Sequence, residues 1–307
     1  MKLRRSLGGQ RVSRGNILMV THDASDSAIA VASSLIDAWT DEDWRIFAVK
    51  DDAERIEKSN KNIECIEKDD LAKIDLVVVA GGDGTILRAV ETVRKNASPI
   101  LGINLGHVGF LAEAEQSDLA EVIKSVNNKK WIVERRMCLQ VEVKLNEKKV
   151  YETFALNDVS IEKTIRGHMF DLILAIDDLP VSEFGADGIV CATPTGSTAY
   201  AFSAGGPVVW PEVEALLVVP ISAHALFAKP LVVSPKSKIS VDIPPQSSPG
   251  ILVADGRREF PLPVGSSVEI TKSHEDVLIA RLNDSSFTNR LVAKFQLPVS
   301  GWRGRKK

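Results

Sequence analysis

The sequence has little of what marks secreted, zinc-binding or disulfide-rich proteins. Its 307 residues include three cysteines, Cys65, Cys138 and Cys191, and no Cys-x-x-Cys pair. An odd, scattered set argues against a disulfide framework and a zinc knuckle, and is typical of a reducing compartment. The five histidines show no metal-ligand spacing with acidic residues or cysteines. We therefore predict a cytoplasmic protein without a metal site made of its own side chains.

An excess of positive charge is also lacking. Lys and Arg total 38 against 41 Asp and Glu, which gives a formal net charge of −3. Binding to nucleic acid or to a membrane surface favours a basic excess, so neither partner is expected. The first 15 residues are basic, but no apolar signal-peptide segment follows them, and we interpret them as a disordered tail.

No uninterrupted hydrophobic run is long enough to form a transmembrane helix. The longest uncharged window, residues 188–211, could span a bilayer by length alone. It is interrupted by Pro194, Gly196 and Gly205 and is rich in hydroxyl side chains. We interpret it as a loop of functional interest rather than as a helix.

The first third of the chain alternates strand and helix signals. Apolar runs at 16–20, 76–80 and 99–104 predict buried strands, and helical spacing appears at 25–40 and 85–95. A β-α-β-α order of this kind is typical of an open parallel sheet covered by helices.

From about residue 134 the apolar period changes to two. Apolar and polar residues alternate, for example, in 141–145, 172–176 and 239–243. This pattern predicts a mostly antiparallel β-domain. The predicted fold is thus an α/β domain over 16–133 followed by a β-rich domain over 134–283, with no low-complexity linker between them.

The first chemistry-bearing motif is Gly-Gly-Asp-Gly-Thr at 81–85, between a predicted strand and a predicted helix. Glycines let the backbone approach a ligand closely, and the helix N-terminus attracts anions. A carboxylate in an anion-binding loop repels phosphate, but it is useful if it accepts a proton from an attacking hydroxyl or holds Mg²⁺ between phosphates. The alternative is a plain tight turn, in which Asp and Gly are common.

The second motif is Thr-Pro-Thr-Gly-Ser-Thr-Ala-Tyr at 193–200, which continues to Gly-Gly-Pro at 205–207. Its closely spaced hydroxyls form a dense set of donors and acceptors, and Tyr200 offers a ring on which a base can stack. The alternative, a Ser/Thr-rich surface loop, fits poorly with the apolar residues on both sides.

Together these motifs resemble those of the NAD kinase family. The 81–85 loop is also similar to one in diacylglycerol kinases, sphingosine kinases and phosphofructokinases. The 193–207 stretch, in contrast, resembles NAD kinases specifically. Further resemblances are the segment 104–111, Asn157-Asp158, Asp187-Gly188 and Asp255-Gly256, over about residues 75–302 in all. The chain has neither Gly-x-x-x-x-Gly-Lys-Ser/Thr nor Gly-x-Gly-x-x-Gly, so P-loop enzymes and the usual dehydrogenase fingerprint are excluded.

The resemblance implies phosphoryl transfer from ATP, or polyphosphate, to the adenosine-ribose 2′-hydroxyl of NAD, with a divalent ion such as Mg²⁺ bound with ATP. It makes Asp83 the general base. The nucleotide-binding residues it implies are Gly82, Gly84, Thr85, Arg88, Asn157, Asp158, His168, Asp187, Thr198, Ala199, Tyr200, Ala201, Phe202 and Ser203. It also implies that the β-domain binds NAD, that residues 284–307 return to the first domain, and that the enzyme is a homodimer or homotetramer.

Asp158 departs from the family pattern, since the commoner residue at that position is Glu, which is one methylene longer. Charge and hydrogen-bonding capacity survive this change, so we expect an altered contact distance rather than lost function. Two other interpretations stay open on sequence alone: a lipid kinase, which shares the first motif, and a dinucleotide-binding sensor without turnover. Binding to phospholipid vesicles would favour the former, and NAD binding without product the latter.

Overall fold

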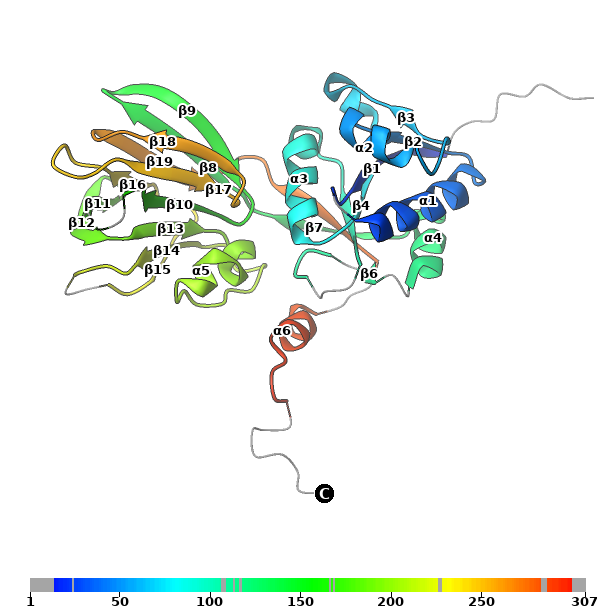
Figure 1. Cartoon of the computed structure of the whole chain (residues 1–307). Coiled ribbons are helices and arrows are strands. Elements are labelled where there is room, and N and C mark those ends of the chain that lie inside the picture. Colours follow the sequence, from blue (N-terminus) through cyan, green and yellow to red (C-terminus); the bar gives the residue numbers. More distant parts are fainter. Residues whose placement is uncertain are drawn as a thin grey trace, which may run out of the picture. The chain divides into compact units, whose positions relative to one another are not determined.

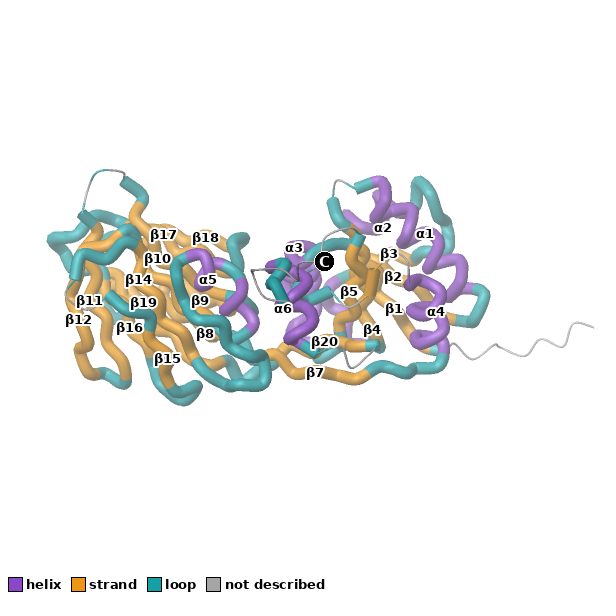
Figure 2. The backbone as a smooth tube through the Cα atoms, turned by 90° about the horizontal axis from the view of Figure 1, so that it is seen from below, coloured by secondary structure: helices purple, strands orange, loops and turns teal. Residues whose placement is uncertain are grey.

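The structure, a computed structural model, describes residues 14–299 except 24, 106–108, 113, 116–117, 166, 168, 226–227 and 283–285. The chain forms two compact units, one of residues 1–134 and 278–307 and the other of residues 135–277. Helices are concentrated in the first unit, whereas strands dominate the second (Figure 2). Among the described residues, no helix is long and apolar enough to cross a membrane.

The first unit is built on an eight-stranded sheet with the order β3-β2-β1-β4-β5-β20-β7, and β6 pairs with β5 (Figure 1). Its strands are β1 (Gly15–Thr21), β2 (Trp44–Ala48), β3 (Glu64–Cys65), β4 (Leu76–Ala80), β5 (Ile100–Asn104), β6 (Ala114–Glu115), β7 (Ile132–Arg136) and β20 (Val277–Arg281). Its helices are α1 (Asp26–Thr40), α2 (Lys50–Ile56), α3 (Asp83–Val93), α4 (Leu119–Asn127) and α6 (Phe287–Phe295). The pairs β1–β2, β1–β4, β4–β5 and β5–β20 are all parallel.

Helices cover both faces of this sheet. Apolar residues of α1, α2 and α4 form one buried cluster with alternate residues of the central strands. Helix α3 covers the opposite face, where a side chain at Gly102 of β5 would come within 2.5 Å of Ile86. Every residue of β4 is therefore buried, which explains its continuous run of apolar residues.

The strand order reverses at β1. The chain runs outward from β1 to β2 and β3, then returns to β4 on the other side of β1. Thr21 and Ala80 pair at the carboxyl ends of these two strands, and the His22 N–H donates to the Ala80 carbonyl at 3.0 Å. In open α/β sheets, ligands bind beside the carboxyl ends of strands at such a reversal. The Gly81 loop follows β4 at this place.

The second unit consists of two six-stranded antiparallel sheets, with the orders β15-β14-β13-β10-β17-β18 and β12-β11-β16-β19-β8-β9. The strands of the first are β10 (Asp158–Lys163), β13 (Gly188–Ala192), β14 (Leu216–Ile221), β15 (Leu231–Val233), β17 (Gly250–Ala254) and β18 (Arg258–Leu262). Those of the second are β8 (Leu139–Leu145), β9 (Lys148–Ala155), β11 (Phe170–Ile176), β12 (Leu179–Ala186), β16 (Ile239–Asp242) and β19 (Ser266–Lys272). One buried cluster contains residues of both sheets, as in a sandwich. The predicted fold class is confirmed.

The return to the first unit begins at Leu278 rather than at the expected residue 284. The reason is β20, whose apolar sequence resembles the preceding strands of the β-domain. Its residue Ile279 instead pairs in parallel with Ile100 of β5, so this strand belongs to the first sheet. Of the predicted 1–15 tail, residues 1–13 lie outside the described part of the chain, and Gly15 already belongs to β1.

Candidate active site

The Gly81–Thr85 loop joins β4 directly to α3. Gly82 is the N-cap and Asp83 is the first helical residue, so the helix begins at Asp83 rather than at the predicted residue 85. Gly81 must lack a side chain, because a Cβ there would lie 2.5 Å from the Thr85 hydroxyl oxygen. At Gly82 and Gly84, in contrast, a Cβ would meet no atom within 4 Å. These two glycines therefore border open space at a helix N-terminus.

The Asp83 carboxylate is held by two backbone N–H groups from a segment after β5. The Phe110 N–H donates to Oδ2 at 3.0 Å and the Leu111 N–H to Oδ1 at 3.2 Å. Gly109 lies against the same carboxylate, and a Cβ there would come within 2.3 Å of Oδ1. Sequence analysis identifies Asp83 but misses these partners. Of the matching segment 104–111, residues 106–108 lie outside the described part of the chain.

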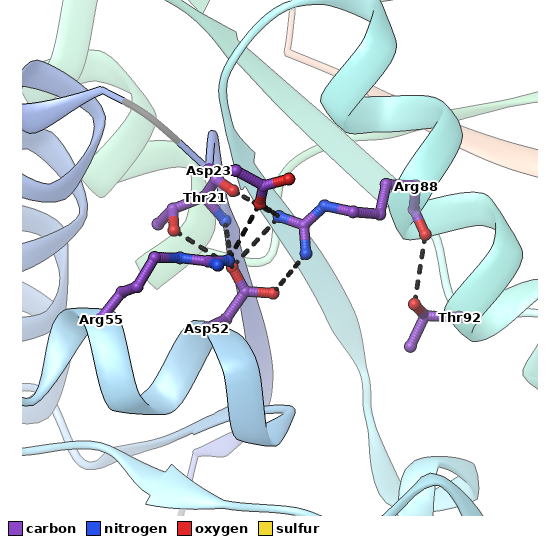
Figure 3. A network of polar contacts seen from close by, with 6 residues as sticks. All are labelled: Thr21, Asp23, Asp52, Arg55, Arg88 and Thr92. Carbon is purple, nitrogen blue, oxygen red and sulfur yellow. Dashed lines mark hydrogen bonds and ion pairs between the residues drawn. The ribbon is translucent and has the colours of Figure 1, made fainter. Parts of the chain in front are cut away.

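Arg88, predicted to face phosphate, lies in a network of acidic groups (Figure 3). Its guanidinium donates to Asp52 from Nη1 at 2.9 Å and from Nη2 at 3.2 Å. Nη2 also contacts the Thr21 carbonyl, and Asp23 lies 3.2 Å away. Asp52 is completely buried and also accepts from the Thr21 N–H at 3.0 Å and from Arg55 at 2.7 Å. The network thus joins α2, α3 and the end of β1.

Burial alone would raise the pKa of Asp52, but hydrogen bonds from Arg88 and Thr21 and the charge of Arg88 more than offset it, so the pKa is lowered. Burial likewise would lower the pKa of Arg88, and its bond to Asp52 instead raises it. Both groups stay charged at neutral pH. Asp52 is a residue that sequence analysis misses, since nothing in its local sequence distinguishes it from other helical acids.

In the second unit, the hydroxyl-rich motif is folded against Asn157. A 3₁₀ helix over Thr195–Thr198 is followed by the short helix α5 (Tyr200–Ser203). Gly196 packs so closely that a Cβ would lie 2.0 Å from the Asn157 carbonyl oxygen. The loop is thereby fixed to the start of β10.

Three hydroxyls in this motif bind nearby backbone carbonyls. Thr193 donates to the Leu156 carbonyl at 2.6 Å, Ser197 to the Pro194 carbonyl at 2.6 Å, and Thr198 to the Thr195 carbonyl at 3.3 Å. Their first role is therefore to set the loop conformation. The sequence suggests that these hydroxyls bind a ligand. In the structure, these three hydroxyls instead donate to backbone carbonyls.

A cavity of about 270 Å³ opens beside this loop, within the second unit. Its lining residues are Asn157, Asp158, Ser160, Glu162, Ala199, Tyr200, Val253, Asp255 and Gly256. The Asp158 carboxylate accepts from the Tyr200 N–H at 3.3 Å, and Tyr200 also bonds to Glu162. Four of the predicted binding residues, Asn157, Asp158, Ala199 and Tyr200, meet here.

Burial raises the pKa of Asp158 to about 7, with a further contribution from the neighbouring Asp255 and despite the Tyr200 N–H. The Asp255 carboxylate fixes the residues just before β10, because it accepts hydrogen bonds from the Leu156 N–H at 3.0 Å and the Asn157 N–H at 2.7 Å. Arg258 pairs with it at 2.9 Å. The sequence motif points to this Asp-Gly pair, but the anchoring role is visible only in the structure.

The other predicted residues lie outside the cavity lining. Asp187 forms an ion pair with Lys163, which lowers the pKa of Asp187 through that hydrogen bond. Ala201 is buried, whereas Phe202 is 40% exposed, similar to the cavity-lining Tyr200 at 38%. Thr198 and Ser203 flank them without lining the cavity. His168 lies outside the described residues.

Comparison with known proteins decides what kind of protein carries these two sites. The model of the ATP-NAD kinase N-terminal domain matches residues 17–131, and that of the ATP-NAD kinase C-terminal domain matches residues 156–282. A curated NAD kinase from Thermobifida fusca is 46% identical over 97% of this chain and 94% of its own length.

The chain belongs to the NAD kinase family. It phosphorylates NAD to NADP, with ATP as the donor that the family name gives. NAD kinase 2 from Streptomyces avermitilis is 56% identical over 75% of this chain and 76% of its own length. An Archaeoglobus fulgidus NAD kinase solved in complex with ATP shares 27% identity and a TM-score of 0.69, over 92% of this chain and 98% of its own.

A yeast NADH kinase solved with NADH has the same fold, with a TM-score of 0.85 at 24% identity over 96% of this chain and 91% of its own. These findings confirm the predicted family, fold and enzyme class. They decide against the lipid kinase and the sensor, the two interpretations that the sequence leaves open. The roles of individual residues stay predictions.

Proposed function

We propose that Asp83 is the general base of this NAD kinase and accepts the proton of the ribose 2′-hydroxyl. The observation that carries the proposal is the fixed position of its carboxylate, which is held by two backbone N–H groups at the N-terminus of α3. Phosphoryl transfer depends mainly on positioning and on charge stabilisation, so an oriented carboxylate is the group that the reaction needs.

We propose that Gly82, Gly84 and Thr85 form the edge at which the ATP phosphates bind. Gly82 and Gly84 have open space where a side chain would stand, so packing within the chain does not require glycine at either place. Close approach of a ligand to the backbone does require it. The first N–H groups of an α-helix generally lack intrahelical partners and face an anion favourably. In α3 the Thr85 N–H already donates to the Gly82 carbonyl at 2.9 Å, so Gly82, Asp83 and Gly84 supply the N–H groups for this role.

The cavity around Asp158 is proposed to bind part of NAD. Its volume of about 270 Å³ suits one ring system of the dinucleotide rather than the whole molecule. Asn157, Asp158 and Glu162 offer hydrogen-bonding groups to hydroxyls, and the partly exposed Tyr200 ring can stack on a base. The remaining predicted residues, Asp187, His168, Thr198, Ala201, Phe202 and Ser203, belong to this proposal through the resemblance alone.

For Arg88 we propose a structural role rather than the phosphate contact that the sequence suggests. Its guanidinium pairs with Asp52 and Asp23 at the strand reversal beside the Gly81 loop. We propose that it supports the phosphate-binding loop by fixing α3 to β1, and that any phosphate contact is secondary to this role.

Mg²⁺ is proposed to arrive with ATP. Among the described residues, no group of three or more His, Cys, Asp or Glu side chains is arranged so that it could hold a metal ion. Mg²⁺ bound to ATP needs few protein carboxylates, since phosphates and water supply most ligands. The ion neutralises negative charge on the donor phosphates during transfer.

We further propose a homodimer or homotetramer, which the resemblance implies, and a cytoplasmic location, which the cysteine content favours. Light scattering at several protein concentrations tests the first, and a mass equal to one chain would contradict it. Fractionation of the source cells tests the second.

The assignment of the base is tested by measuring NADP formation from NAD, ATP and Mg²⁺ with an NADP-specific coupled dehydrogenase. Asp83→Asn should lose turnover by a factor of about 100 or more. Asn157→Ala is the companion variant, which should weaken NAD binding measured by calorimetry. Near-normal turnover by Asp83→Asn would rule out Asp83 as the base, whereas unchanged NAD affinity in Asn157→Ala would contradict the pocket assignment.

A further inference from the structure

The segment Gly109–Leu111 is held from two sides. Its N–H groups at Phe110 and Leu111 bind the Asp83 carboxylate. The carbonyls of the same two residues accept hydrogen bonds from Arg281, at 3.5 Å from Phe110 and 3.0 Å from Leu111. Arg281 and Asp83 are therefore connected through the backbone of these two residues.

Arg281 is well placed to act as a rigid support. It ends β20, its residue is 1% exposed, and its Nε donates to Glu134 at 3.0 Å. A planar guanidinium with several bound N–H groups has little freedom to rotate. The chain reaches this position only because the C-terminal segment returns to the first sheet.

The helix α6 supplies the second support. The ring of Phe110 lies between two aromatic rings of this helix, with centroid distances of 5.8 Å to Phe287 and 5.9 Å to Phe295. Both pairs are tilted, an arrangement that aromatic rings favour. Ser286 caps the helix by accepting from the Asn289 N–H at 3.3 Å, which fixes where α6 begins. Figure 1 shows α6 in red, near the end of the chain.

We propose that the C-terminal segment, through Arg281 and the Phe287–Phe110–Phe295 cluster, positions the base Asp83 for proton transfer. The inference rests on the proposed role of Asp83. Arg281 then contributes to the reaction although it follows Leu111 by 170 positions, since the two residues come into contact in the folded chain. Arg281, Phe287 and Phe295 are positioning residues, since they act on the reaction through Phe110 and Leu111.

Loosening the aromatic cluster is the first test. Phe295 is half-buried, so Phe295→Leu removes the ring contact with Phe110 while keeping an apolar side chain at the site. We expect kcat to fall about tenfold, because small displacements of a reacting group slow transfer strongly. The KM for NAD and the KM for ATP should change by less than about twofold, since neither substrate is expected to contact this ring.

Phe47→Leu is the matched control, with the same substitution in the same unit at a buried position of β2. It should lower the melting temperature at least as much as Phe295→Leu while leaving kcat near the wild-type value. Phe295→Tyr retains the ring and should restore kcat. Equal kcat in Phe295→Leu and Phe47→Leu would overturn the proposal, as would failure of Phe295→Tyr to recover turnover.

Arg281→Lys gives an independent measurement. It keeps the positive charge beside Glu134 and loses the fork that reaches both carbonyls. We again expect a lower kcat with little change in KM. If Asp83→Asn is inactive while Phe295→Leu and Arg281→Lys turn over like wild type, the base is right and the positioning role is wrong. If Asp83→Asn itself turns over normally, the proposed function has failed.

Discussion

Gly109 and Asp83 are in such close contact that a side chain at Gly109 would displace the Asp83 carboxylate. A Cβ at Gly109 would lie 2.3 Å from Oδ1 of Asp83 and 3.0 Å from its carboxyl carbon. The next two residues donate the N–H groups that hold this carboxylate. The absence of a side chain at Gly109 is thus a condition for the position of Asp83.

Gly109→Ala should therefore displace the Asp83 carboxylate and lower kcat by about tenfold or more. The melting temperature should fall only slightly, because the Gly109 backbone has no left-handed conformation for alanine to strain. Steady-state kinetics and thermal melts on the same preparation check this. A variant with wild-type kcat would show that the carboxylate can move without consequence.

Gly84→Ala is the contrasting substitution, since the added methyl meets no atom of the chain within 4 Å. Alanine is the better helix former, so the free protein should be about 0.5–1 kcal/mol more stable. The same methyl would project into the space proposed for phosphate, and the KM for ATP should rise. Urea unfolding measures the free energy of unfolding, and steady-state kinetics at varied ATP concentration measure the KM for ATP. An unchanged KM for ATP would remove Gly84 from the phosphate site.

Asp52→Asn tests the network in Figure 3. The amide would leave Arg88 and Arg55 without their buried charged partner, and we expect a loss of about 1–3 kcal/mol in the free energy of unfolding at pH 7. Glu64→Gln is the control, because it removes a carboxylate from an ion pair with Arg45 whose side chains are half exposed. That loss should stay below about 1 kcal/mol.

The Asp52 effect should also depend on pH. The pKa of Asp52 is lowered in the folded chain, so its contribution is fully present above the unfolded value of about 4 and is lost as the pH falls through the folded pKa. The difference in unfolding free energy between wild type and Asp52→Asn should shrink below about pH 4. A difference that stays constant down to about pH 2 would contradict the charged pair.

Asp158 should have the opposite pH dependence. Its pKa is raised to about 7 in the folded chain, against about 4 when unfolded, so the folded state binds more protons between these values. Stability should therefore fall as the pH rises from about 4 to 7, by up to a few kcal/mol, and then level off. Asp158→Asn should lack this fall. The measurement is the free energy of unfolding of wild type and of Asp158→Asn at about pH 5 and pH 8. An equal decrease in both proteins between these pH values would contradict the raised pKa of Asp158.

The main features of the fold and the position of Asp83 could be predicted from local sequence. The run Leu76–Ala80 is apolar throughout because helices cover both faces of β4, and the glycine turn after it marks the helix start. Period-two alternation predicted the β-domain for the equivalent reason, since β8, β11 and β19 each bury alternate residues on one face of their sheet.

The partners of the site residues could not be predicted in this way. Phe110 and Leu111 follow Asp83 by 27 and 28 positions, and Asp52 precedes Arg88 by 36, so only the folded sheet brings them together. The same holds for β20, whose local pattern does not show which sheet it joins. Sequence could identify the polar groups in the Thr193–Ser203 stretch, but not that several of them bind nearby backbone carbonyls.

A single-turnover experiment shows most directly whether Asp83 takes the proton of the 2′-hydroxyl. Enzyme in excess over NAD, mixed with ATP and Mg²⁺, reports the transfer step without product release, and calorimetry reports NAD affinity separately. We expect Asp83→Asn to bind NAD like wild type and to form NADP at least about 100 times more slowly. Transfer at the wild-type rate by Asp83→Asn would mean that another group takes the proton.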